Sequence, residues 1–190
     1  GDMGLTSNLV SSTDCTPLQK CKTLPDGGEI EVDDNVMDNV AFYSRNLAVP
    51  TRRDIDDPTV RQGEQLFRKL ECASCHRPRL TTQPGGVAAQ LAEQTIWPYS
   101  DMLLHDMGEG LADGRPEYQA DGNEWRTPPL WGLGLAQSVN PQAGFLHDGR
   151  ARTLEEAILW HAGEADASRE AYKALEASER QQLLDFLNSL

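Results

Sequence analysis

Two cysteines and a histidine lie together in ECASCHRPR, residues 71–79, as Cys72, Cys75 and His76. This CxxCH pattern could hold zinc, perform thiol redox chemistry or attach a haem. A structural zinc site needs four ligands, commonly from two such knuckles, and the sequence has no second CxxC or CxxH. A thioredoxin-like centre follows a buried strand, whereas the preceding QLFRKLE is typical of a helix. The pattern therefore favours covalent haem c, with Cys72 and Cys75 bonded to the vinyl groups and His76 as proximal iron ligand.

A haem iron has a second axial position, and the chain offers several side chains for it. The candidates are Met37, Met102, His105, Met107, His147 and His161. His161 shares a predicted helix face with Leu154, Ala157 and Ile158, so it is either a core histidine or a ligand aimed inward. Met107, in a loop that precedes glycines, is the methionine alternative. Spacing alone leaves both open.

Four helices are predicted from apolar periodicity and capping residues. The first covers 33–47, capped by Asp33 or Asp34, and the second begins with Asp57 as N-cap and Pro58 as first helical residue. A third starts at the capping box TLEE, residues 153–156, and the last at Ser178, with Gln181 in the matching position. Gly63 is unfavourable inside the second helix, so we expect another backbone to approach it closely, as the first and last helices of a cytochrome c fold do.

The elements predict a mostly α fold: a cytochrome c-type haem domain at 58–190, with a long loop-rich insertion at 77–152. Residues 49–57 form a linker. Residues 1–48 end in a helix whose Val40, Tyr43 and Leu47 repeat the spacing of Leu183, Phe186 and Leu190. This weak repeat is a hint that the first segment is the tail of another, similar domain.

Composition limits the partners and the compartment. The net charge of −13 argues against nucleic acid, and it either steers a basic redox partner or only keeps the protein in solution. No apolar run is long enough to span a membrane. Cys15 and Cys21 favour a short-loop disulfide, which fits an oxidising compartment. The first ten residues do not form a signal peptide, so in an exported protein the signal would be cleaved or lie upstream.

Four motifs, in order, carry a resemblance to a known family: CASCHRPR, PYSDMLLHDMGEGLAD, WRTPPLWGLG and FLHDGRARTLEEAILWHAGEA. Together they resemble the bacterial di-haem cytochrome c peroxidase superfamily, most closely its di-haem oxidoreductase branch, sometimes labelled thiol oxidoreductases. The resemblance covers essentially the whole chain. It implies two cytochrome c domains, each with one CxxCH, of which the N-terminal one is peroxidatic and the C-terminal one relays electrons.

The resemblance also implies residue roles. The family's distal ligand of the C-terminal haem lies fourteen residues after the histidine of an H-[DS]-G loop, and counting from His147 gives His161. Two imidazoles leave no open iron position and favour the ferric state, so this haem would transfer electrons at low potential. Arg126 resembles an arginine that faces the haem propionates, and Met107 stays the alternative ligand.

This sequence has one CxxCH where the family has two. We therefore expect the C-terminal half of a periplasmic di-haem protein, separated from its N-terminal haem domain, that exchanges electrons with a small redox protein. Calcium is a further candidate cofactor of the full-length protein. Two alternatives stay open: a haem enzyme with an open iron that reacts with peroxide or oxygen, and a non-haem zinc or disulfide module.

Overall fold

A computed structural model describes residues 5–10, 27–86 and 88–190 and divides the chain into two compact units, Gly1–Ala48 and Val49–Leu190. The structure is 40% helical and 9% strand, which confirms the mostly helical class. The cytochrome c-type assignment and the domain limits stay predictions. No helix in the described ranges is long and apolar enough to cross a membrane. The predicted Cys15–Cys21 disulfide lies outside the described residues.

Among the described residues of the first unit, one helix forms, α1 (Asp34–Arg45), where the sequence predicts it. Asp33 caps it, since its carboxylate accepts a 3.0 Å hydrogen bond from the backbone N–H of Val36. The helix buries none of its residues, although one face carries Val40 and Tyr43, which are 56% and 66% exposed. Its apolar face therefore has no partner within the described part of the chain.

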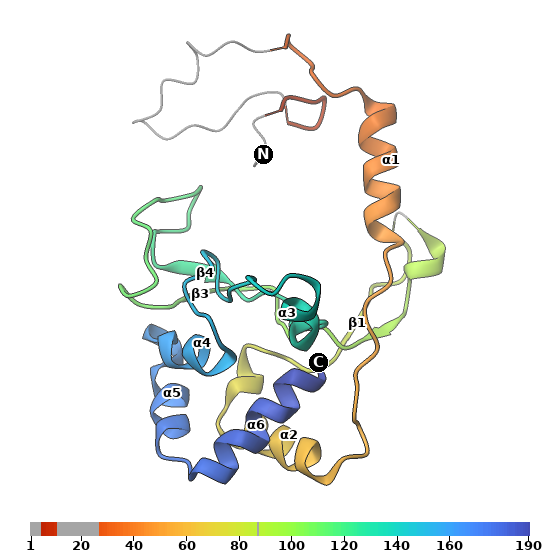
Figure 1. Ribbon diagram of the computed structural model, residues 1–190. Helices are drawn as coiled ribbons and strands as arrows, with labels where there is room; N and C mark the ends of the chain where they lie inside the picture. Colours follow the sequence, from red (N-terminus) through yellow and green to blue (C-terminus); the bar gives the residue numbers. More distant parts are fainter. Residues whose placement is uncertain (1–4, 11–26, 87) are drawn as a thin grey trace. The chain divides into compact units, whose positions relative to one another are not determined.

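Two helices form the centre of the second unit: α2 (Pro58–Lys69) and α6 (Ala177–Ser189), which cross in Figure 1. Asp57 caps α2 and Pro58 begins it, as predicted. Gly63 lies at the crossing, where a Cβ atom would fall 2.7 Å from the Cβ of Phe186 and closer still to the carbonyl oxygen of Gln182. The predicted close approach is confirmed, and only glycine fits it.

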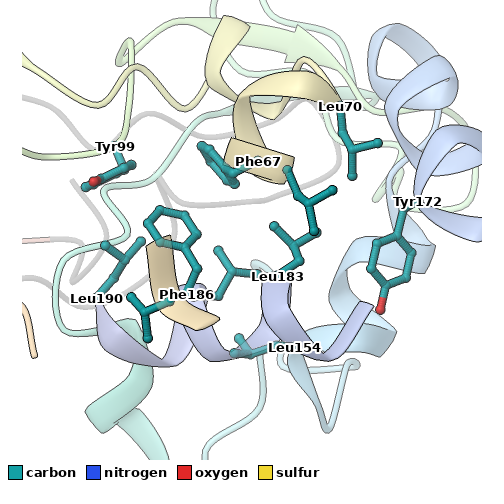
Figure 2. Packing of buried hydrophobic residues seen from close by; sticks show 11 residues of the cluster. Phe67, Leu70, Tyr99, Leu154, Tyr172, Leu183, Phe186 and Leu190 are labelled. Carbon is teal, nitrogen blue, oxygen red and sulfur yellow. The ribbon is translucent and has the colours of Figure 1, made fainter. Parts of the chain in front are cut away.

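The core lies around this crossing (Figure 2). The rings of Phe67, Tyr99 and Phe186 contact one another, with centroids 5.2–6.1 Å apart. Other buried members are Val60, Leu66, Leu70, Leu154, Tyr172, Leu183, Leu187 and Leu190. The aromatic cluster joins α2 and α6 to the segment around Tyr99, and so fixes the end of α2 that leads into the CxxCH motif.

The start of α6 differs from the prediction. Glu176, not Ser178, is its N-cap, and it forms a capping box with Glu179 rather than with Gln181. In α4 (Leu154–Trp160) Thr153 caps as predicted, but the Glu156 carboxylate accepts from the backbone N–H of Arg152 instead of reaching back to Thr153. Both helices form; the details of their caps were wrong.

A further helix, α5 (Asp166–Lys173), was not predicted. It follows the 3₁₀ turn η5 (Gly163–Ala165) and buries Tyr172, whose hydroxyl donates a 3.1 Å hydrogen bond to Glu155 of α4. The contact between α5 and α4 supports the helix that ends at His161.

The insertion is ordered by short elements rather than by loops alone. Strands β1 (Leu80–Thr81) and β2 (Thr95–Ile96) pair antiparallel, as do β3 (Leu104–Asp106) and β4 (Glu124–Arg126). The turns η3 (Ala89–Leu91) and η4 (Leu133–Leu135) and helix α3 (Ala136–Val139) complete it. Gly134 lies against the end of α6, where a Cβ would fall 2.6 Å from the carbonyl carbon of Asn188. The insertion is thereby packed onto the core.

Candidate functional site

The CxxCH motif forms one tight turn at the end of α2. Glu71 has a left-handed backbone, φ 64°, which ends the helix and starts the 3₁₀ turn η2 (Cys72–Ser74). The backbone N–H of His76 then donates a 3.0 Å hydrogen bond to the carbonyl of Cys72. Both thiols are free and half-buried. The turn therefore places two thiols and an imidazole at adjacent positions on a rigid support.

His76 has a defined tautomer. Its Nδ1 lies 3.0 Å from the carbonyl oxygen of Tyr99, and because a carbonyl only accepts, Nδ1 carries the proton. Burial lowers the pKa of His76 to about 4, so the ring is neutral at pH 7 and Nε2 keeps its lone pair. A backbone carbonyl on the second nitrogen is the usual support of a metal-ligating histidine.

His161 is oriented in the same way. It is the C-cap of α4, and its Nδ1 lies 2.7 Å from the carbonyl oxygen of Ala157, one turn earlier. Burial also lowers the pKa of His161, so Nε2 again carries no proton and can ligate a metal ion. Within the described ranges, the only hydrogen bond of either imidazole runs through Nδ1.

The two imidazoles are neighbours, with ring centroids 6.3 Å apart and planes at 48°. An imidazole nitrogen lies about 1.1 Å from its ring centroid and about 2 Å from a metal ion that it ligates. Two imidazoles on opposite sides of one ion therefore have centroids about 6.2 Å apart. The spacing and the free Nε2 atoms fit a haem iron held by His76 and His161, with Cys72 and Cys75 beside it for the thioether bonds.

The thiols themselves do not favour redox chemistry. Burial raises the pKa of Cys72 to about 11, and burial followed by the charges of Asp101 and Glu164 raises the pKa of Cys75. The reactive form of a cysteine is the thiolate, which is scarce at neutral pH in such surroundings. Unmodified, these cysteines are poor nucleophiles toward a disulfide substrate.

A possible zinc cluster lies beside Cys75, whose ligand atom lies within 4.8 Å of those of Asp101 and His105. However, His105 is held between two carboxylates, with Nδ1 2.8 Å from Glu164 and Nε2 2.9 Å from Asp101. The hydrogen bond to Glu164 is the largest cause that raises the pKa of His105. With a carboxylate on each of its nitrogens, the imidazole has no free nitrogen to offer to zinc. The cluster is an ion-pair network, and the sequence analysis missed it because Cys75 and Glu164 lie 30 and 59 residues from His105 along the chain.

The methionine alternative also lies near this turn. Met107 follows β3, and its backbone N–H donates to the carbonyl of Asn123. The next residue, Gly108, packs against the turn after His161: its Cβ would fall 3.0 Å from that of Ala162. The structure thus brings the loop of Met107 against the segment that carries His161. The ring that lies next to His76, however, is that of His161.

Arg126 lies in β4 and is exposed; its Nη1 lies 3.6 Å from Sδ of Met102. The neighbouring Trp125 stacks on His147, with centroids 3.5 Å apart and planes at 11°. The Nε1–H of Trp125 is buried and has no hydrogen-bond partner among the described residues. This orphaned donor is a second observation that fits a missing polar group, such as a carboxylate of a cofactor. The role of Arg126 toward a propionate stays a prediction.

A family model described as "Di-haem oxidoreductase, putative peroxidase" matches residues 6–190. The chain belongs to this family. The resemblance seen in the four motifs is therefore confirmed, and the family implies haem cofactors and oxidoreductase chemistry. No curated protein and no solved structure matches the chain.

Proposed function

We propose that the chain binds one haem c covalently through Cys72 and Cys75, with His76 and His161 as axial ligands, and transfers electrons. The observation that carries this proposal is the neighbouring pair of neutral imidazoles, with ring centroids 6.3 Å apart and each Nδ1 hydrogen-bonded to a backbone carbonyl. When bound in this way, a haem supplies one-electron transfer. Two imidazoles would fill both axial positions, so this site would relay electrons rather than bind peroxide.

The residues of the chain would each do a simple task. The Tyr99 and Ala157 carbonyls hold the protons on Nδ1 and so keep Nε2 free as a ligand atom. The core rings of Phe67 and Phe186 support the turn and keep water from the proximal side. The buried Nε1–H of Trp125 is available to a propionate.

We further propose that the partner of this unit is a first haem domain, on the same or another chain, in a periplasmic di-haem protein. The exposed apolar side chains of α1 and of Leu47, just after its end, support this. Val40, Tyr43 and Leu47 are 56%, 66% and 57% exposed, whereas Leu183, Phe186 and Leu190, with the same spacing, are 3% exposed or less. The face would pack against a glycine-containing helix, as α6 packs against α2. A calcium ion would belong to that complete protein.

The test is a visible spectrum of the chain made with haem-maturation machinery, oxidised and then reduced with dithionite. We expect a low-spin c-type spectrum without the weak red sulfur-to-iron band, and a high-spin spectrum for His161→Ala. Met107→Ala is the matched control and should leave the spectrum unchanged. A sulfur-to-iron band that is present in the wild type and lost in Met107→Ala would mean that Met107, and not His161, is the sixth ligand. A high-spin wild type would favour the enzyme with an open iron, and a colourless protein would refute haem binding.

A further inference from the structure

An arginine-rich pocket of about 440 Å³ lies in the second unit, outside the pair of histidines. We call it the arginine pocket; it is lined by Arg52, Glu64, Arg68, Ala73, Arg77, Pro78, Arg79, Trp97 and Tyr99. Four of these residues are cations and one is an anion, so the lining carries a net charge of about +3 at neutral pH. The whole chain carries −13. The pocket is therefore a local reversal of the protein's charge.

Two of the arginines are already paired and two are not. Glu64 accepts from Arg52 at 2.9 Å and from Arg68 at 2.9 Å, which fixes these three side chains of the lining. Arg77 and Arg79 are exposed, and no carboxylate in the described part of the chain lies within ion-pair distance of either. Two guanidinium groups at the rim are thus available to an anionic group from outside.

Trp97 adds an apolar contact at the same rim. Its side chain is 58% exposed, which is unusual for the largest apolar residue. Tryptophan and arginine are the residues most enriched at the centres of protein interfaces, where the ring supplies contact area and the guanidinium the directed hydrogen bonds. Their combination favours a protein surface over a small ion as the occupant.

The wall of the pocket continues into the proposed haem site. Ala73 lies between the two cysteines, and Arg77 directly follows His76. Tyr99 lines the pocket, and its carbonyl accepts the hydrogen bond from Nδ1 of His76. A partner seated here would be separated from the proximal ligand by one residue and one hydrogen bond.

We propose that the arginine pocket docks an acidic one-electron redox protein, whose carboxylates meet Arg77 and Arg79 and whose apolar contact is Trp97. The partner gives up one electron, which reduces ferric to ferrous haem, or takes one in the reverse direction. This inference rests on the proposed haem function. Opposite charges around the two redox centres would steer the encounter and orient the complex.

The first test is the salt dependence of electron transfer to small probes. The reduced chain is oxidised by tris(oxalato)cobaltate(III), an anion, and by tris(phenanthroline)cobalt(III), a cation. If the net charge governed the encounter, salt would accelerate the reaction with the anion, because screening removes repulsion. The pocket predicts the opposite: about a tenfold slower reaction between ionic strengths of about 0.02 and 0.5 M.

Arg79→Glu would lower the net charge of the lining from about +3 to about +1 and is expected to weaken that salt dependence, whereas Arg115→Glu, the matched control, should change it far less. Both arginines are exposed, neither has an ion-pair partner among the residues described, and the two changes alter the charge equally. An anion reaction that accelerates with salt in the wild type, or equal effects of the two variants, would overturn the proposal.

The second test does not need the haem to react. The indole N–H of Trp97, assigned with Trp97→Phe, is followed by NMR during titration with an acidic blue-copper protein in its diamagnetic cuprous form. We expect a shift that salt and Arg79→Glu abolish. A shift with free oxalate but none with the copper protein would mean a small-anion site and refute the docking proposal, as would no shift at all. A colourless chain refutes the haem function separately, while this titration still tests the pocket.

Discussion

Gly63→Ala is the sharpest test of how the fold supports the site. The added Cβ would fall 2.7 Å from the Cβ of Phe186, and closer still to the carbonyl oxygen of Gln182, while ordinary contact begins at 3.4 Å. Helices α2 and α6 would have to separate by at least 0.7 Å, the difference between these two distances. Because close-packed cores do not yield continuously, we expect strain at the upper end of the overpacking range, about 3 kcal/mol.

The alanine also improves helix propensity by about 1 kcal/mol, so the net loss of unfolding free energy is about 2 kcal/mol. For a unit of this size that lowers Tm by about 4–8 °C. Thermal unfolding followed by circular dichroism measures the shift. Gly110→Ala is the control, since a Cβ there meets nothing closer than 3.6 Å and its φ is not left-handed. A Gly63→Ala variant as stable as the wild type would refute the close packing of α2 on α6.

Three further predictions concern the segments that hold the site. Glu164 raises the pKa of His105, so their pairing stabilises the fold at pH below about 6.5, and this stabilisation is lost as the pH rises through the pKa of the folded state. Denaturant unfolding at pH 6 and pH 9 should show the loss in the wild type. The variant His105→Gln should not show it. Thr153→Ala removes the cap of α4 and should cost about 1 kcal/mol of unfolding free energy, which Thr153→Ser restores; equal stability of the alanine variant would exclude the cap. Tyr172→Phe removes the hydrogen bond to Glu155 and should lower the unfolding free energy, measured by chemical denaturation, by about 1 kcal/mol. Tyr172→Ala also removes the buried ring and should lower it by about 3–5 kcal/mol. Similar losses for the two variants would mean that packing contributes little.

The predictable helices are those whose ends are specified by residues adjacent in the sequence. Asp57 followed by Pro58 specifies one start, and the structure agrees. Near the last helix two caps compete within three residues, Glu176 and Ser178, and the intrinsic preference for serine pointed to the wrong one. The capping box of Glu176 with Glu179 wins there because both of its hydrogen bonds form.

The site likewise has features that neighbouring residues predict and features that depend on residues far apart in the sequence. The prediction of covalent attachment rests on Cys72, Cys75 and His76 alone, because these residues lie next to one another in the sequence. The carbonyl that orients His76 belongs to Tyr99, and the carboxylate that holds His105 belongs to Glu164, 59 residues away. Such pairs depend on how the insertion packs against the turn after α4. There Gly163 has φ 57°, and a Cβ would fall 2.9 Å from the backbone nitrogen of Gly108. No periodic pattern in the sequence encodes that approach.

The distribution of charge on the surface is the feature that composition predicts least well. A net charge of −13 leads to the expectation of a basic redox partner, because far from the protein only the sum matters. Within a Debye length of about 8 Å the individual side chains matter instead. The linker, a helix and a loop supply Arg52, Arg68, Arg77 and Arg79, and the fold gathers them in the lining of one pocket beside the CxxCH turn. A partner that reaches contact would therefore meet a positive surface on a negative protein, so it needs local acidity rather than a basic net charge. The sign of the salt dependence with the anionic oxidant separates these two levels of electrostatics: acceleration by salt means that the net charge governs the encounter, and slowing means that the pocket does.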